Sequence, residues 1–281
     1  KTLMKGMERA YNEREKTESD RFVQEYVGNF LQKEPIPGLE KEYSYYQQFM
    51  EGITLEEVNK FTASTIPDAE SKLILLLAPE KPEYELPSNE KLIGFAEAAA
   101  KLEVKPYEEK VVAASLMEEP PAPGRIGFQK ENKEAGYYEV TLGNGIKVIL
   151  KPTDYKNDQI VLSGFRSGGH FNYENKDRYT AENAATLVSQ MGVGKFSPND
   201  LRKTLAGKTV NASPRISSTS EGISGSSSAT DLETMFQLVH LYFTQPRKDD
   251  ELYKSFVSKQ QAMVQNMLSD PQMVFQDSLL R

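Results

Sequence analysis

The sequence predicts an α+β protein, and three observations favour that class. The first part of the chain places apolar residues at the three- and four-residue spacings of amphipathic helices. The last part combines short alternating segments, typical of strands, with further helical patterns. Between them, from Pro79 to Gly124, lie seven of the fifteen prolines, which predicts an extended, semi-rigid linker with one short helical turn in FAEAAAKLE.

Composition excludes several classes of protein. The longest apolar run has six residues, Leu73 to Ala78, and the mean hydropathy is -0.57, so the sequence predicts a soluble chain with no membrane insertion. A net charge of -7 without a concentrated basic patch argues against a nucleic-acid partner. The absence of cysteine excludes disulfides, thiolate zinc sites and cysteine nucleophiles. Because the chain opens at Lys1 within a helical pattern, we expect it to be a piece of a longer protein.

The first part of the chain is predicted to be mainly helical. A helical pattern runs from Lys1 to Gln32, and its apolar stripe consists of Phe22, Tyr26, Val27 and Phe30. EPIPG breaks this pattern, a second helix includes YYQQFM, and a third begins at Thr54, where Thr54 and Glu57 match a capping box. KLILLLAPE then predicts a buried strand that ends at Pro79.

The last part of the chain opens with a predicted hairpin. In YYEVTLGNGIKVILKPT, alternating residues flank Asn144-Gly145, a pair suited to a type I′ turn. QIVLSGFRSGG predicts a further strand, and helices follow over residues 179–191 and 197–206. Ser197 is the expected cap of the second helix, and Pro198 is its first residue.

A serine-rich tract, KTVNASPRISSTSEGISGSSS, follows Gly207. We expect it to form sheet, because its small side chains would let a neighbouring helix or strand come close, and the alternatives are a mobile loop or an anion site at the next helix N-terminus. Thr230 and Glu233 predict a capping box for that helix. Its predicted buried stripe consists of Leu232, Met235, Phe236, Val239 and Phe243.

Residues for catalysis or metal binding are scarce. The two histidines, His170 and His240, lie 70 positions apart, and neither has a partner at the spacing that places two imidazoles on one helical face. His170 follows two glycines and is predicted to face solvent in a loop, and His240 is predicted to have a hydrogen-bonded packing role. No serine lies in a G-x-S-x-G elbow.

One family is similar to this arrangement. SGSSSATDLETMFQLVHLYFTQPR, together with LGNGIKVILKPT, resembles the start of a domain of the pitrilysin (insulinase) family of zinc metallopeptidases, especially its bacterial periplasmic members. REKTESDRFVQEYVGNF, GITLEEVNKF and LILLLAPE resemble the close of the preceding domain. The resemblance implies two partial homologous domains, at 1–79 and 137–281, each a sheet covered by helices on one face, with a linker at 80–136 between the two halves of the protein.

The resemblance also implies that this chain lacks the catalytic motif. Active members carry H-x-x-E-H on a helix and a further Glu on a later helix, which hold zinc and activate water. The corresponding positions in this sequence are Ala185, Val188, Ser189 and Asn266. These side chains cannot replace a zinc ligand set and a general base. We therefore assign no catalytic or metal residue here, leave the substrate-binding residues unassigned, and expect zinc elsewhere in the parent protein.

The resemblance implies one of two alternative functions. In the first, the chain contributes wall and linker to a two-half clamshell chamber that degrades peptides in the periplasm or another exported compartment, together with the catalytic half of the same chain or a paired active subunit. In the second, it belongs to an inactive binding or scaffold subunit. An H-x-x-E-H motif upstream of Lys1 would distinguish them. Exposed strand edges would also permit a homo-oligomer of this chain.

Overall fold

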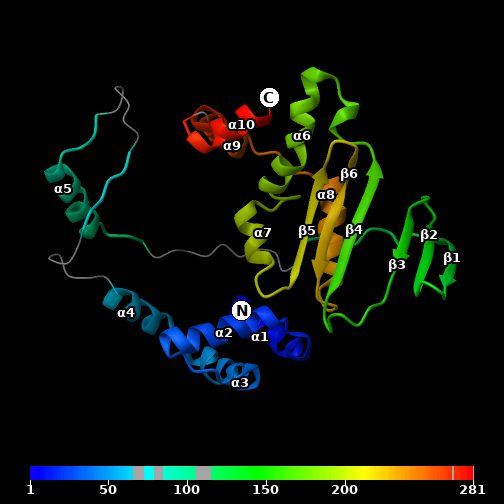
Figure 1. Ribbon diagram of the computed structural model, residues 1–281, viewed down its shortest axis with the longest axis horizontal. Coiled ribbons are helices and arrows are strands. Elements are labelled where there is room, and N and C mark those ends of the chain that lie inside the picture. The colour runs from blue at the N-terminus through cyan, green and yellow to red at the C-terminus, as the bar shows by residue number, and fades with distance from the viewer. Residues whose placement is uncertain (66–72, 79–84, 106–114, 268, 281) are drawn as a thin grey trace. The chain divides into compact units, whose positions relative to one another are not determined.

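The computed structural model of the chain describes residues 1–65, 73–78, 85–105, 115–267 and 269–280 (Figure 1). Two compact units are present: one joins Lys1–Gln47 with Val112–Arg281, and the other is Gln48–Val111. The first unit holds all the described strands and all the buried apolar residues of the described chain. It therefore carries the folded core. The predicted α+β class is confirmed.

Three helices open the first unit. They are α1 (Thr2–Asn12), α2 (Ser19–Gln32) and α3 (Leu39–Phe49), with a 3-10 turn at Arg14–Lys16. The ring of Tyr11 stacks on that of Tyr43 with centroids 4.7 Å apart, and the Arg14 guanidinium lies 4.4 Å from the Tyr11 centroid. The predicted break at EPIPG is confirmed, since α2 ends at Gln32 and its C-cap residue, Lys33, has a left-handed φ of 60°. Aromatic contacts thus join α1 to α3.

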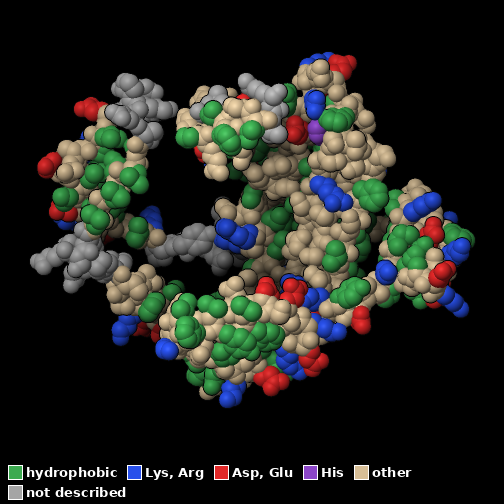
Figure 2. All heavy atoms as spheres, in the orientation of Figure 1, with side chains coloured by type: hydrophobic (Ala, Val, Ile, Leu, Met, Phe, Trp, Pro, Cys, Tyr) green, Lys and Arg blue, Asp and Glu red, His purple; other side chains and the backbone are tan. Residues whose placement is uncertain are grey.

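The apolar stripe of α2 remains largely in solvent. Phe22, Tyr26 and Phe30 are 41%, 61% and 75% exposed, and no described residue of α1, α2 or α3 is buried. Figure 2 shows hydrophobic side chains gathered on the surface of α2 and α3. The helical periodicity therefore predicted the helix α2 correctly, but the apolar stripe of that helix is not buried in the structure.

The predicted hairpin is confirmed and belongs to a three-stranded antiparallel sheet. The strands are β1 (Ile126–Asn132), β2 (Tyr137–Leu142) and β3 (Lys147–Leu150), in the order β1-β2-β3. The predicted type I′ turn is wrong, because Gly145 has a positive φ (86°) and Asn144 does not. The Gly145 amide instead donates to the Leu142 carbonyl, and Gly145 takes the left-handed position that closes a three-residue hairpin loop.

A second antiparallel sheet contains the serine-rich tract. Its strands are β4 (Ile160–Ser167), β5 (Val210–Ile216) and β6 (Ser220–Ser227), in the order β4-β6-β5. The prediction that this tract forms sheet is confirmed. A Cβ atom at Gly225 would lie 2.7 Å from the Asn211 carbonyl oxygen and 3.2 Å from Met235 Sδ. The small residue therefore permits the close packing of helix and strand that the sequence predicted.

The core lies between this sheet and α8 (Leu232–Thr244), which runs behind β5 and β6 in Figure 1. One buried cluster consists of Leu116, Val193, Phe196, Leu238 and Leu241. The predicted stripe of α8 is wrong in part, because Phe236 and Phe243 are 51% and 68% exposed while Met235 and Leu238 are buried. Since α8 carries apolar residues on nearly all sides, its hydrophobic pattern alone could not select the face that meets the sheet.

The N-terminus of α8 is built differently from the predicted capping box. Asp231 is the N-cap residue, and no side chain caps the helix there. The Ser228 hydroxyl donates to Asp231 Oδ2 and accepts from the Asp231 amide, and the Thr209 amide donates to Asp231 Oδ2 at 2.8 Å. A buried carboxylate of the chain itself thus lies at this helix end, so the alternative of an anion site there gains no support.

Four further helices complete the first unit. They are α6 (Asn175–Gln190), α7 (Pro198–Thr204), α9 (Asp250–Met267) and α10 (Pro271–Leu280). The predicted cap of α7 is confirmed, because Ser197 Oγ accepts from the Asp200 amide and Pro198 is the first helical residue. The helix predicted over 179–191 is α6, which begins four residues earlier. Both α6 and α8 contact β5.

The second unit contains helices and extended chain in its described residues. It comprises a 3-10 turn at Met50–Gly52, α4 (Leu55–Thr65) and α5 (Asn89–Ala100). The Thr54–Glu57 capping box is confirmed by reciprocal bonds of 2.8 and 3.2 Å. Two predictions are wrong: the linker carries a helix of 12 residues rather than one turn, and Leu73–Ala78 is exposed and not a strand. No described strand pairs with residues 73–78, and without a ladder a strand does not form.

Candidate functional site

The positions that correspond to the zinc-binding motif lie on α6 and α9. Ala185, Val188 and Ser189 are half-buried and share one face of α6, since they are spaced by three and four residues. Asn266 is exposed near the end of α9, and α9 contacts α6. The structure therefore brings the two helices that carry these positions into contact.

The donor atoms at these positions do not fit a zinc ion. Ala185 and Val188 carry no side-chain donor atom, and Ser189 and Asn266 offer one neutral hydroxyl and one neutral amide. Among the residues that the structure describes, no group of three or more His, Cys, Asp or Glu side chains could hold a metal ion. No reaction step through a metal is assigned to these residues.

The Ser189 hydroxyl is engaged in the packing of α6. Its Oγ donates to the Ala185 carbonyl oxygen at 2.9 Å and lies 3.4 Å from Ser213 Oγ on β5. Such a bond to the carbonyl four residues back is a common fate of serine within a helix. Activation as a nucleophile would need a hydrogen-bonded base, and neither the Ala185 carbonyl nor the Ser213 hydroxyl can act as one. Ser189 thus stabilises the contact between α6 and β5.

Arg247 fixes the start of α9 to the end of α6. Its guanidinium donates to the Met191 carbonyl at 2.9 Å and lies 2.8 Å from Asp249 Oδ2. The Leu252 amide donates to Asp249 Oδ1 at 3.0 Å, which caps α9. That bond, followed by the bond from Arg247, lowers the pKa of Asp249. The role of Arg247 was not predicted from the sequence, although Asp249, which directly precedes a helical pattern, was a usable signal for the N-terminal cap of α9.

His170 is buried, so the prediction that it faces solvent is wrong. It opens a 3-10 turn, His170–Asn172, whose first two amides donate to the carbonyls of Ser217 and Ser218 at 3.0 and 3.1 Å. These bonds hold the turn against the connection between β5 and β6. The imidazole meets the Phe171 ring edge-on with centroids 4.9 Å apart, and the Arg178 guanidinium lies 4.6 Å from the Phe171 ring centroid. His170 is therefore part of a packed cluster.

His240 lies half-buried on α8, and its predicted hydrogen-bonded packing role stays a prediction. Its carbonyl accepts from the Thr244 hydroxyl at 2.8 Å. A catalytic histidine would need a nucleophile or a second metal ligand within hydrogen-bonding reach. Neither histidine is placed in such a group in the described chain.

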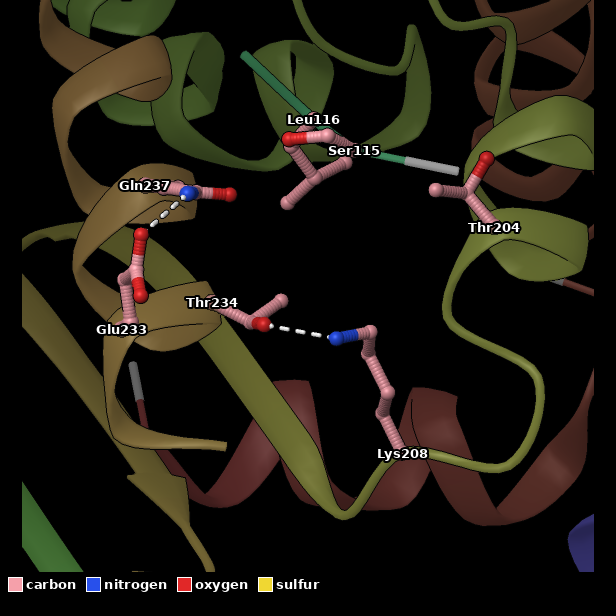
Figure 3. Close-up of a pocket in the computed structure, with 7 residues that line it drawn as sticks. All are labelled: Ser115, Leu116, Thr204, Lys208, Glu233, Thr234 and Gln237. Atoms are coloured by element: carbon pink, nitrogen blue, oxygen red, sulfur yellow. Dashed lines mark hydrogen bonds between the residues drawn. The ribbon is translucent and has the colours of Figure 1, made fainter. Parts of the chain in front are cut away.

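A cavity of about 210 Å³ lies beside α8 (Figure 3). Its lining residues are Ser115, Leu116, Thr204, Lys208, Glu233, Thr234 and Gln237. Lys208 Nζ donates to Thr234 Oγ1 at 3.0 Å, and Gln237 Nε2 donates to Glu233 Oε1 at 3.1 Å. These bonds hold the polar groups to one another rather than aiming a base at a nucleophile, so the cavity has no arrangement for hydrolysis.

Comparison with known proteins gives relatives of one kind. No protein-family model matches the chain. A protein of Arabidopsis thaliana named "Zinc protease PQQL-like" is 26% identical over 246 residues, which is 86% of this chain and 23% of that protein. A protein of Haemophilus influenzae named "Probable zinc protease PqqL" is 22% identical over 222 residues, which is 79% of this chain and 24% of that protein. The chain thus spans about a quarter of the length of these relatives.

A solved structure confirms the fold. The crystal structure of the periplasmic protease PqqL from Escherichia coli matches 99% of this chain and 30% of that chain, with a TM-score of 0.53 and 17% sequence identity. The chain is homologous to proteins named zinc protease PqqL, bacterial proteins among them. The resemblance to pitrilysin-type zinc metallopeptidases is therefore confirmed.

Proposed function

We propose that this chain is a non-catalytic segment of a zinc-dependent metalloendopeptidase. The observation that carries the proposal is the set of residues at the motif positions, since the contacting helices α6 and α9 have Ala185, Val188, Ser189 and Asn266 there. Relatives named zinc proteases support a peptidase as the parent protein. In this proposal the parent holds zinc with residues outside this chain and cleaves peptides.

The proposed domain organisation follows the sequence boundaries. Residues 1–79 would close a domain of the first half, 80–136 would link the halves, and 137–281 would begin a degenerate domain of the second half. The buried core beneath β5 and β6 supports a folded second domain. In a two-half chamber, that domain would form wall around a peptide. We further propose an exported, periplasmic setting, since the solved neighbour is named a periplasmic protease. Among the described residues, none of the helices has both the length and the apolar character of a membrane span.

The first test measures zinc content and peptide cleavage. Both are determined for the 281-residue chain and for the same protein extended upstream of Lys1, using a quenched fluorescent peptide library. Zinc and cleavage in the extended protein alone are the expected result. Absence of both from both proteins would favour an inactive binding subunit, and activity in the 281-residue chain would overturn the assignment of the motif positions.

A second test asks whether α6 and α9 keep the geometry of a zinc site. The variant A185H/V188E/S189H/N266E installs the motif at the proposed positions, where zinc is expected to bind at one equivalent per chain. The matched control shifts the motif back by two residues, as N183H/T186E/L187H/N266E, which turns the new ligands to another face of α6. Equal zinc binding by both variants, or binding by the control alone, would contradict the proposed positions.

A further inference from the structure

Two cavities lie along one side of α8, and the segment Ser115–Glu119 contributes to the walls of both; the surface of α8 that they share is called the α8 groove. At one end is the cavity of Figure 3, and at the other is a second cavity lined in part by Gly194, Lys195, Leu241 and Gln245. The residues of α8 that line the two cavities, from Glu233 to Gln245, recur at three- and four-residue spacings along one side of the helix. Leu116 lines both cavities, so it separates them.

Leu116 is the apolar anchor of this segment. Its side chain is 5% exposed and belongs to the same buried cluster as Val193, Phe196, Leu238 and Leu241. Met117 packs against that cluster with partial burial. Burial this complete is unusual for a leucine in a proline-rich linker, where an extended chain normally has no core to enter. The core beneath β5 and β6, in the proposed second-half domain (137–281), is therefore completed by a residue of the linker.

Polar contacts define the ends of the segment. Ser115 Oγ donates to the Met117 carbonyl at 2.7 Å and accepts from the Met117 amide at 3.3 Å, a local turn that presents Leu116 to the groove. The Glu118 carboxylate is paired with Lys195, whose neighbour Phe196 is part of the buried cluster. The groove thus holds a leucine and, two residues later, a paired carboxylate of the chain's own segment.

We propose that Ser115–Glu119 is an intramolecular ligand of the α8 groove, a clip that fastens the linker to the second domain. The contact of the linker with the second-half domain then begins at Ser115 rather than at Gly124. Pro120, Pro121 and Pro123 form a stiff connection from the clip to β1. This inference concerns the chain's own geometry and holds whether or not the parent protein is a peptidase.

Binding of the clip in trans tests the proposal directly. A fluorescent peptide of residues 115–122, SLMEEPPA, is titrated into the full 281-residue chain and into its Leu116→Asp variant. The variant should bind the peptide at least about tenfold more tightly than the unchanged chain, because the clip in cis competes at high effective concentration. A peptide carrying aspartate in place of the leucine is the matched control and should not bind. Equal binding by the two proteins, or none by a folded Leu116→Asp variant, would overturn the proposal.

A charge exchange tests the clip without disturbing the core. Glu118→Lys and Lys195→Glu should each raise the amide hydrogen-exchange rates of residues 115–119 by about two- to fivefold, the range of an exposed ion pair, and the double variant should restore them. Glu119→Lys makes the same change of charge beside the ion pair and should have a smaller effect. Additive rather than compensating effects of the two exchanges would show that Glu118 does not hold the clip, and the proposal would fail.

Discussion

Two regions of the molecule, α2 and α8, each have an apolar stripe that the sequence predicts, with opposite outcomes. In α8, Met235 and Leu238 are 0% and 2% exposed, whereas Phe30 on α2 is 75% exposed. All the buried apolar residues of the described chain lie between Leu116 and Leu241. The difference is the partner, because α8 rests on a sheet in which Gly225 lets it approach closely, whereas no residue of α2 is buried against a neighbouring element. An amphipathic pattern predicts a helix, but tertiary packing decides its contribution to stability.

The largest expected effect is truncation within the α8 core. Met235→Ala should lower the free energy of unfolding by about 2–5 kcal/mol, because it leaves a cavity beside Gly225. Phe30→Ala, which removes an exposed ring on α2, should change it by less than about 0.5 kcal/mol. Urea denaturation followed by far-UV circular dichroism measures both. Similar losses for the two variants would mean that α2 has a buried partner and would end the contrast between the regions.

Replacement of glycine by alanine should change stability with opposite signs beside α8 and in the exposed helix α5. Gly225→Ala should destabilise by about 1–3 kcal/mol, because its Cβ would meet the Asn211 carbonyl and the Met235 sulfur. Gly94→Ala in α5 should stabilise by about 0.5–1 kcal/mol, because the residue lies inside a helix with nothing within 4 Å of its Cβ. Thermal unfolding of each variant against the unchanged chain gives the sign. A loss of stability for Gly94→Ala would indicate a packed surface on α5.

The order of the elements could be predicted from the sequence, whereas contacts between distant residues could not. The hairpin, the Thr54–Glu57 box and the Ser197 cap depend on neighbours within a few positions, and all three are present. His170 is buried because its turn bonds to residues nearly 50 positions away, as at Ser217. Likewise, nothing local marks Leu116 as a core residue. At the candidate site, the positions that lack the motif residues could be predicted from the sequence. The contact between α6 and α9 is seen only in the structure.

A smaller effect is expected where α6 meets α9. Arg247→Ala should destabilise the chain by about 0.5–1.5 kcal/mol, because the Met191 carbonyl loses its hydrogen-bond donor. Lys248→Ala is the matched control and should have almost no effect, since that side chain is 88% exposed. Chemical denaturation compares the two variants. An equal, small change in both would mean that Arg247 does not hold α9 in place.

The smallest effect is the pH dependence of the same contact. The pKa of Asp249 is lowered, first by the Leu252 amide and then by Arg247. A carboxyl group with a lowered pKa in the folded state adds stability above its ordinary value, and that stability is lost as the pH falls through the lowered value. The unchanged chain should therefore lose stability in acid more steeply than Asp249→Asn, whose amide cannot titrate. Denaturation series from neutral pH to below the ordinary pKa of aspartate measure the difference. Parallel curves would mean that the cap of α9 forms equally well with a neutral side chain, and α9 would then depend on Arg247 through its bond to Met191 alone.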